Sequence, residues 1–366
     1  IVFGDWSSDV CSSDLLGATI TAAAGYIGNF ITTVKYDRRV REIRHGAAVI
    51  AIGAREYKPT EYLYGQNDRV LTHLELEERL AAGDEGLINA RAVVMIQCVG
   101  CRNQDRNYCS RICCSHAVKN ALNLKAANPG VDIHILFRDM RTYGYLEDYY
   151  REASNRDVRF IRYEPDEPPT LEAVEEDGRP VLRVAVTDPV LCVGIGVDAD
   201  YVSLAAAIVP PEENKEISRL FKVSLGPDEF FKEAHVKLRP VEFAAGGVYL
   251  AGLAHYPKHI NETINQAQGA AGRVLTLLSH DAVTVSGSVC VVDEKKCLGC
   301  GACAAVCAYG AIDLHETRLG QKALVNPVLC KGDGLCNAKC PTGAIVLKHF
   351  TDQEMLCQID AAFPPE

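Results

Sequence analysis

The chain has 366 residues and a formal net charge of -10. This acidic balance argues against nucleic-acid binding, because the phosphate backbone requires clustered lysine and arginine. The chain is 48% hydrophobic and 23% charged, which is ordinary for two or three soluble domains. No apolar run approaches the roughly 18 residues that indicate a membrane span, so we expect no direct membrane span.

Residues 1–15 lack both helical and strand periodicity. They resemble a translated sequencing-adapter remnant more than a protein segment, so we exclude them, with Trp6 and Cys11, from fold predictions. On this interpretation the natural N-terminus is missing, and the chain is an N-terminally truncated part of a longer protein.

The next elements predict an α/β fold with a parallel sheet. Residues 16–60 alternate apolar and polar side chains, and a short apolar run closes on Gly53-Ala54, which indicates a buried strand and a tight turn. The βαβ unit of a parallel sheet is predicted by a strand at 92–97, a helix at 110–127 and a strand at 131–137.

The other predicted elements follow in chain order. Helices are expected at 74–82, 145–155 and 261–279, and strands at 159–162, 182–186, 191–193, 201–209 and 247–252. The segment 164–180 is rich in proline and acidic residues, which indicates an exposed connection. The strands at 182–186 and 191–193 are expected to pair.

Sixteen cysteines require an explanation. A disulfide-rich secreted protein is usually short and has a signal peptide, and neither description fits this chain. Its cysteines cluster instead at spacings that bind metal. We therefore expect a reducing cytoplasm, with the thiolates bound to metal.

Two cysteine runs near the C-terminus repeat each other at an offset of 33 residues. The first has the C-x2-C-x2-C-x3-C spacing of bacterial ferredoxins, whose fourth cysteine reaches the other cluster, and the second matches it except for Asp333. The duplication predicts a pseudo-twofold module with two [4Fe-4S] clusters. The expected ligands are Cys297, Cys300, Cys303 and Cys340 for cluster one, and Cys330, Cys336, Cys307 and Asp333 for cluster two.

Two alternatives concern these ligands. Zinc sites also use paired cysteines, but the third and fourth cysteines of this spacing do not suit zinc. Asp333 is a harder ligand than a thiolate, which leaves an Asp-ligated cubane, a three-iron cluster or a labile iron as outcomes for cluster two.

A second cysteine set contains Cys98, Cys101, Cys109, Cys113 and Cys114 within seventeen residues. It follows a buried strand and opens a helix, where an ordinary dinucleotide domain has its phosphate-binding glycines. A helix N-terminus stabilises an anionic cluster as well as it stabilises a phosphate. Buried core cysteines are the alternative explanation.

Glycine turns after two strands suggest a flavin. Gly53-Ala54 and Ala251-Gly252, with Pro257-Lys258, could direct backbone N–H groups at its anionic edge. Tight turns that pack a parallel sheet explain the same glycines equally well.

At these residues the chain resembles the HdrA-like family, the FAD/iron–sulfur flavoproteins of heterodisulfide reductase, from about residue 17 onward. The resemblance is carried by the run from Ile96 to Cys114, by segments 25–30, 137–144 and 252–260, and by the double-cubane tail. It implies a thioredoxin-reductase-like flavoprotein core with two dinucleotide-binding domains, here partial, and a C-terminal α+β 2[4Fe-4S] ferredoxin domain.

The resemblance also implies FAD and a cubane on Cys98, Cys109, Cys113 and Cys114, with Cys101 as a spare. The implied flavin contacts are Gly53, Ala54, Gly252, Leu253, Ala254, Pro257, Lys258 and Ala267. Leu253 stands where many relatives have an acidic residue, so the backbone is expected to hold the flavin there. The glycine loop for the FAD diphosphate is absent from this sequence, and weak FAD retention is expected.

The expected domains follow from these elements. They are a non-native segment at 1–15, a partial FAD-binding domain at 16–85, a second dinucleotide-type domain at 86–240, a return segment of the FAD domain at 241–282, the ferredoxin domain at 286–349 and a tail at 350–366.

The resemblance implies a cytoplasmic oxidoreductase component that is active only within a complex. Its implied partners are sister heterodisulfide reductase subunits, a hydrogenase or dehydrogenase that donates electrons, and ferredoxin, with flavin-based bifurcation as an implied mechanism. The redox cofactors would do the chemistry, because no side chain resembles a nucleophile or general base. The alternatives are a quinone-linked relative in sulfur metabolism, an NAD(P)H-dependent iron–sulfur flavoenzyme and a scaffold that binds iron only for stability.

Overall fold

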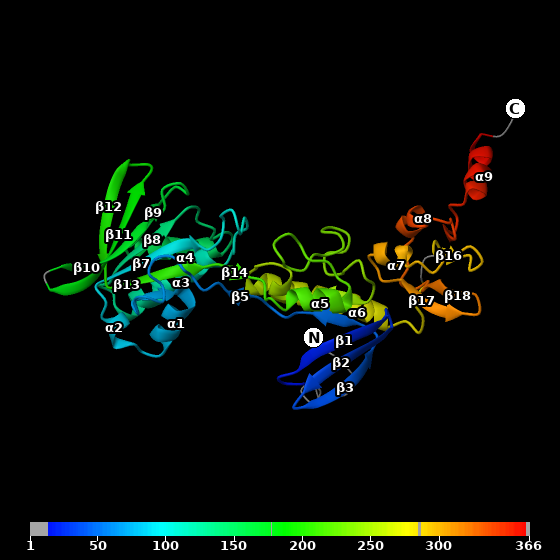
Figure 1. Cartoon of the computed structure of the whole chain (residues 1–366). Helices are drawn as coiled ribbons and strands as arrows, with labels where there is room; N and C mark the ends of the chain where they lie inside the picture. The colour runs from blue at the N-terminus through cyan, green and yellow to red at the C-terminus, as the bar shows by residue number, and fades with distance from the viewer. Residues whose placement is uncertain (1–13, 177, 285–286, 364–366) are drawn as a thin grey trace. The chain divides into compact units, whose positions relative to one another are not determined.

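The computed structural model describes residues 14–176, 178–284 and 287–363. The predicted non-native segment therefore lies almost entirely outside the described residues. The chain divides into two compact units, drawn in Figure 1. The sheet unit contains residues 53–211 and 256–263, and the split unit contains residues 1–52, 212–255 and 264–366.

The sheet unit is built on a five-stranded parallel sheet in the order β6-β13-β7-β8-β9. Its strands are β6 (Val70–Thr72), β7 (Ala92–Val99), β8 (Asp132–Phe137), β9 (Val158–Arg162) and β13 (Tyr201–Ala206). Its helices are α1 (His73–Ala81), α2 (Glu85–Ile88), α3 (Cys113–Ala127) and α4 (Leu146–Asn155). The predicted βαβ unit is therefore confirmed as β7-α3-β8.

The two faces of this sheet are covered differently. Leu76 of α1 and Leu124 of α3 pack on the face that bears Met95. The opposite face packs against a three-stranded antiparallel sheet, whose Leu182 and other inward side chains complete a second core. That sheet contains β10 (Thr170–Glu176), β11 (Arg179–Asp188) and β12 (Val193–Ala199). A short pair, β5 (Arg55–Glu56) and β14 (Ile208–Val209), completes the unit.

Three sequence predictions are corrected here. The strand predicted at 191–193 is a turn up to Cys192, and β12 begins only at Val193, because Pro189 and the positive φ of Cys192 suit a turn. The exposed connection predicted at 164–180 contains β10. The domain boundary predicted at residue 85 lies at residue 52, because β6 pairs with β13 in the sheet.

The split unit begins with the antiparallel meander β1 (Thr19–Tyr26), β2 (Asn29–Tyr36) and β3 (Arg39–His45). Its central parallel pair is β4 (Ala48–Ile50) with β15 (Val248–Leu250). Phenylalanines from several segments, including Phe231 and Phe243, fill the core between them and α5 (Asn214–Phe221). The 3-10 turn η1 (Gly252–Ala254) follows β15, and α6 (Ile260–Leu278) begins in the sheet unit and continues into this one.

The ferredoxin part belongs to the split unit. Its two short sheets are β16 (Cys290–Val292) with β19 (Ile345–Leu347) and β17 (Ile312–Thr317) with β18 (Gly320–Val325). One helix follows each cysteine loop, α7 (Ala302–Val306) and α8 (Leu335–Lys339). The predicted tail instead contains the helix α9 (Asp352–Ala362), which begins with a capping box between Thr351 and Glu354.

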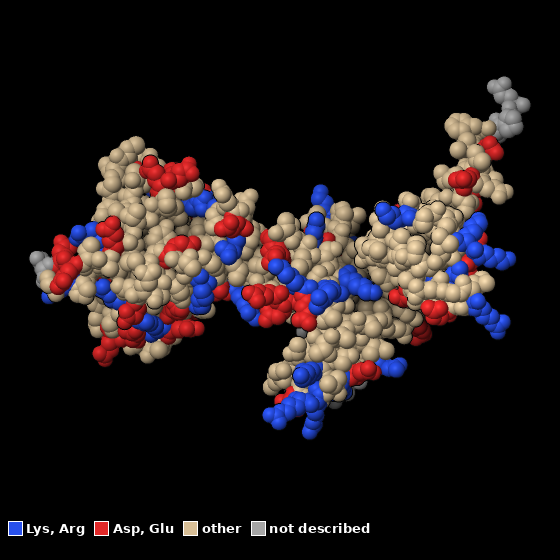
Figure 2. Space-filling view, viewed as in Figure 1, with Lys and Arg blue, Asp and Glu red and all other residues tan. Residues whose placement is uncertain are grey.

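The predicted fold class, α/β with a C-terminal α+β ferredoxin domain, is confirmed. Figure 2 shows acidic and basic side chains interspersed over the face in view, with basic side chains gathered on the meander β1–β3. Among the residues that the structure describes, no helix combines the length and the apolar character needed to cross a bilayer.

His73 makes the sheet unit sensitive to acid. Its ring is buried and hydrogen-bonds Ser203 Oγ at 2.6 Å and Gln97 Nε2 at 3.1 Å. Burial, and next the nearby His116 and Lys119, lower the pKa of His73 well below its ordinary value near 6.5. The unfolded chain therefore gains a proton below pH 6.5 that the folded chain excludes, so stability is full above this pH and falls by ~1.4 kcal/mol per pH unit below it.

We expect the His73→Gln variant to lose less melting temperature than the wild type between pH 7.5 and pH 5.5. The exposed His280 provides the control, since His280→Gln should leave the pH dependence unchanged. Equal pH dependence in all three chains would contradict the assignment.

Candidate functional site

The cysteine loops of the ferredoxin part wind tightly because glycine is present at fixed positions. Gly299 has φ +69°, and a Cβ there would lie 2.2 Å from the Gln321 carbonyl oxygen. Its counterpart Gly332 also has φ +69°, with the Ser288 carbonyl oxygen 2.4 Å from a Cβ. Only glycine suits such a close approach with positive φ.

A cavity forms at the first loop. All four predicted ligands of cluster one line it. Backbone N–H groups already point at ligand sulfurs: Gly299 donates to Cys297 Sγ at 3.4 Å and Ala344 donates to Cys340 Sγ at 3.3 Å. Such bonds stabilise thiolates and the anionic clusters that they hold, so the donor set and the cavity fit a cubane.

The ligands of cluster two have a similar environment with one difference. The Ala311 N–H donates to Cys307 Sγ at 3.4 Å, as the matching Ala344 does to Cys340. Cys336 is buried, whereas Asp333 is exposed and its Oδ1 accepts from the Leu335 N–H at 3.3 Å. Sequence reasoning also missed Cys290, which is buried beside these ligands.

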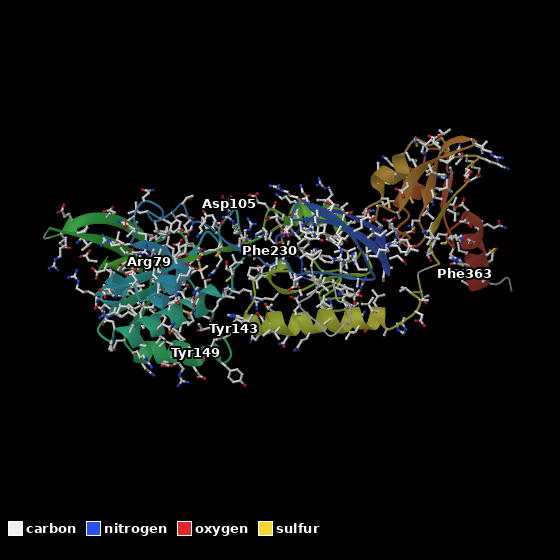
Figure 3. The ribbon with its side chains drawn as sticks, turned by 90° about the horizontal axis from the view of Figure 1, so that it is seen from below. Arg79, Asp105, Tyr143, Tyr149, Phe230 and Phe363 are labelled. Carbon is white, nitrogen blue, oxygen red and sulfur yellow. The ribbon has the colours of Figure 1, made fainter. Side chains whose placement is uncertain are left out.

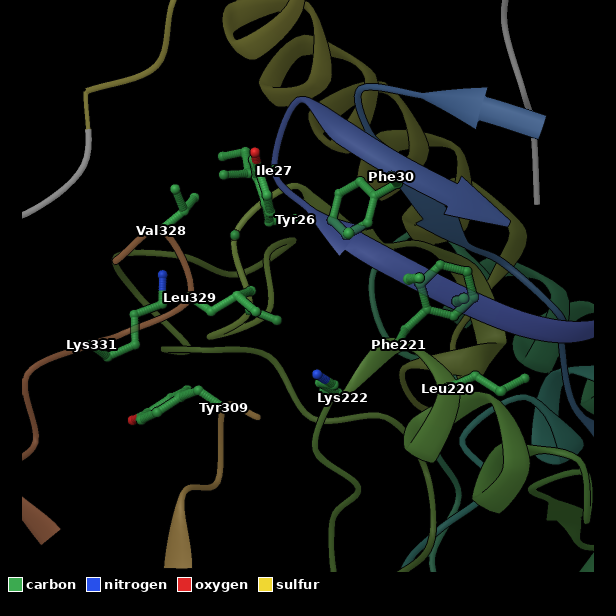
Figure 4. A pocket seen from close by; sticks show the side chains of 15 residues that line it. Tyr26, Ile27, Phe30, Leu220, Phe221, Lys222, Tyr309, Val328, Leu329 and Lys331 are labelled. Atoms are coloured by element: carbon green, nitrogen blue, oxygen red, sulfur yellow. The ribbon is translucent and has the colours of Figure 1, made fainter. Parts of the chain in front are cut away.

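The neighbours of cluster two also line a pocket of the split unit. Tyr309, Leu329 and Lys331 form one wall, and Tyr26 and Phe30 of the meander lie opposite (Figure 4). The lining therefore includes residues next to Cys330 and Cys307. Sequence reasoning gave no signal for this pocket.

The second cysteine set lies at the carboxyl end of β7 and the start of α3. Cys98 ends the buried part of the strand with φ +63°, and Cys113 and Cys114 are the first two residues of the helix. Four of the five cysteines are buried, and Cys109 is half-buried. The structure thus gathers this set where parallel sheets bind their ligands.

Hydrogen bonds between thiols shift their acidity. The bond from Cys113 lowers the pKa of Cys114 and raises that of Cys113 itself. The Cys101 thiol accepts from Cys98, which lowers its pKa to about 7. Across the described part of the chain, no three histidine, cysteine or carboxylate groups converge on a single metal ion. A cubane is the better fit, because its four thiolates each bind a different iron.

Arginines surround the exposed side of this set. A cavity of about 760 Å³ is lined by Cys109, two tyrosines and four arginines, namely Arg102, Arg111, Arg138 and Arg141. Arg102 Nη1 lies 3.8 Å from Cys98 Sγ, and the Arg111 N–H donates to Cys109 Sγ at 3.3 Å. These positive charges would offset the negative charge of a thiolate-bound cluster.

Carboxylates hold two of the arginines. Arg102 pairs with Asp139 at 2.5 Å. Arg111 pairs with Glu262 on α6 at 2.7 Å, and it also donates to the Pro257 carbonyl at 3.2 Å and to Tyr143 Oη at 2.9 Å. Figure 3 shows Tyr143 beside the start of α6, where its ring meets His259. Sequence reasoning missed these arginines, because no spacing rule marks them.

We expect Arg102→Met to lower the midpoint potential of the adjacent cluster by ~40 mV, which corresponds to ~1 kcal/mol for one electron. The reduced cluster is more negative, so loss of a nearby cation disfavours reduction. Redox titration followed by EPR would measure the shift. Arg151→Met on the exposed face of α4 is the matched control, and an equal shift there would contradict the role of Arg102.

The predicted flavin contacts divide between the two units. Gly53, Ala54, Pro257 and Lys258 lie in the sheet unit, and Gly252, Leu253, Ala254 and Ala267 lie in the split unit. Within the split unit, Leu250 pairs with Ile50, so the strands that lead into both glycine turns end side by side.

The geometry of the glycine turns fits close approach by a ligand. Gly53 and Gly252 have φ +76° and +73°, and a Cβ on Gly53 would meet open space. The Gly252 N–H donates to Gln266 Oε1 at 2.9 Å, and Gln266 Nε2 lies 2.8 Å from His255 Nδ1. Sequence reasoning missed Gln266 and His255.

The fold and these cysteine sets define the class of protein, an α/β chain with a dicluster ferredoxin domain. The model of the 4Fe-4S dicluster domain family matches residues 296–344, which confirms this domain. A crystal structure of T. acidophilum thioredoxin reductase is similar over 72% of this chain and 75% of that chain, with a TM-score of 0.46 and 14% identity.

More particularly, the chain is a relative of the HdrA proteins of heterodisulfide reductase, and the predicted resemblance is confirmed. It is 39% identical over 345 residues to the HdrA iron-sulfur protein of the CoB–CoM heterodisulfide reductase of Methanocaldococcus jannaschii, which covers 89% of this chain and 52% of that protein. It is 37% identical over 347 residues to the HdrA protein of the H(2):CoB-CoM heterodisulfide,ferredoxin reductase of Methanothermobacter thermautotrophicus, over 90% and 51%. The chain thus spans about half the length of these curated relatives.

Proposed function

We propose that the chain is an electron-transfer component of a cytoplasmic heterodisulfide reductase-like complex. It would pass electrons between a hydrogenase or dehydrogenase partner, FAD, ferredoxin and a disulfide-reducing subunit. The carrying observation is that cysteines replace the phosphate-binding loop at the β7–α3 junction while twin cysteine loops form the ferredoxin part. When bound, FAD exchanges electron pairs and single electrons, and the cubanes carry single electrons.

The side chains described above have distinct tasks in this proposal. Cys98, Cys109, Cys113 and Cys114 would hold one cubane. Arg102 and Arg111 would neutralise its charge, and the buried helix start would exclude water from it. Backbone N–H groups at Gly252 and Gly53 would face the flavin. Bifurcation of an electron pair is the finer part of the same proposal.

The names of the relatives support the choice of complex. The relative from Methanococcus maripaludis belongs to an enzyme named H(2)/formate:CoB-CoM heterodisulfide,ferredoxin reductase. This name joins a donor, a disulfide and ferredoxin, which are the three roles proposed here. The NAD(P)H-dependent alternative is disfavoured, because a nicotinamide diphosphate would need the loop that the cysteines occupy.

Anaerobic purification of the chain with iron and sulfide supplied tests the proposal. Three cubanes predict about twelve iron atoms and as many acid-labile sulfides per chain, together with a brown colour that dithionite bleaches. A colourless protein, or one that contains zinc alone, would overturn it.

A further inference from the structure

The two halves of the ferredoxin part correspond residue by residue, and this correspondence singles out Cys290. In the second half, Cys290 of β16 pairs with Leu347 of β19. In the first half, Ala323 of β18 pairs with Leu314 of β17. Both residues of the second pair lie 33 positions from their counterparts in the first, the same offset that relates the cysteine loops. Cys290 is therefore the structural counterpart of Ala323.

The position of Ala323 shows what a side chain there touches. Ala323 is buried and lines the cavity that holds the four predicted ligands of cluster one. By the same symmetry, the side chain of Cys290 lies at the wall of the site for cluster two. The first half has an apolar methyl group at this wall, and the second half has a thiol.

Direct contacts agree with this placement. Cys290 is 3% exposed, and its Sγ lies 3.3 Å from Cys336 Sγ. Its N–H also donates to Cys330 Sγ at 3.5 Å. Cys290 is thus within reach of whatever Cys330 and Cys336 bind.

The second difference between the halves is the missing thiolate. Asp333 occupies the position of Cys300, 33 residues on, and its exposed carboxylate accepts from the Leu335 N–H at the start of α8. The half that lacks a cysteine in its loop is therefore the half that gains a cysteine on its neighbouring strand, and the number of thiols around each cluster stays at four. Iron in a cubane prefers thiolate to carboxylate.

We propose that Cys290, rather than Asp333, supplies the fourth ligand of cluster two, which would be a complete all-cysteine cubane on Cys290, Cys307, Cys330 and Cys336. The inference rests on the proposed iron–sulfur function. Asp333 would remain a helix-capping residue at the surface.

The test compares four variants of the full chain, prepared anaerobically with iron and sulfide. Cys290→Ala should lose about one iron atom per chain and convert one cubane into a three-iron cluster, visible by EPR of the oxidised protein and by Mössbauer spectroscopy. Asp333→Ala should keep the wild-type spectrum and iron content. Cys357→Ala, which removes an exposed cysteine on α9, is the matched control and should also leave both unchanged.

The double variant Cys290→Ala with Asp333→Cys separates ligation from packing. It restores the ordinary ferredoxin motif, so the four-iron cluster should return. A three-iron cluster in Asp333→Ala but not in Cys290→Ala would overturn the proposal, as would a loss in Cys290→Ala that Asp333→Cys does not repair. The signal of cluster one should persist in every variant, and its absence from the wild type would instead refute the proposed function.

Discussion

Cys113→Ser is expected to remove about four iron atoms per chain while both ferredoxin clusters remain. Cys113 is 6% exposed and lies at the first residue of α3, next to Cys114 and close to Cys98 and Cys101. A serine there offers a hard oxygen in place of a thiolate, inside a buried site that water cannot complete. Iron analysis with low-temperature EPR would measure the loss, because the ferredoxin signals should stay unchanged.

Cys101→Ser is the matched variant for this experiment. Cys101 is as buried as its neighbours and hydrogen-bonds Cys98, but it is the proposed spare of the set. Its replacement should keep the full iron content, with at most a change in midpoint potential. The ligand assignment would be wrong if Cys101→Ser lost the cluster and Cys113→Ser kept it.

The sequence predicted most strongly what repeats or alternates. The ferredoxin part could be predicted because cysteine and glycine recur at a fixed offset, and the βαβ unit because its strands are continuous apolar runs. The boundary at residue 52 could not, since β6 has only three residues and joins the sheet through its pairing with β13. Pairing between distant strands leaves no periodic signal in a short segment.

The same limit explains the site residues that the sequence missed. Cys290 precedes Cys297 by seven positions, outside any ligand spacing, and only the strand register identifies its counterpart. Arg102 and Arg111 reach the cysteine set because they have φ +56° and +63° in an irregular loop. Gln266 meets Gly252 across a turn of the chain. Each of these contacts depends on tertiary packing.

The 366-residue chain is expected to bind FAD with a Kd of roughly 1 µM or weaker, equivalent to about -8 kcal/mol. Much of the affinity for a dinucleotide comes from its diphosphate at a glycine-rich helix N-terminus. In the described residues, the β7–α3 junction bears cysteines at that place, and the proposed flavin contacts are strand-end turns with few charged groups. Flavin fluorescence titration, followed by gel filtration, would measure binding and retention.

A pair of glycine variants locates whatever FAD binding this chain has. Gly252→Ala should weaken it at least tenfold, ~1.4 kcal/mol, because φ +73° disfavours a side chain and the turn must shift its N–H group. Gly272→Ala on α6, where a Cβ would meet open space, should leave binding unchanged. Near-stoichiometric FAD after gel filtration would contradict weak retention, and equal affinity in both variants would remove Gly252 from the flavin site. Tight binding would then require a diphosphate site on residues other than these strand-end turns, since a few backbone donors cannot offset the charge of two phosphates.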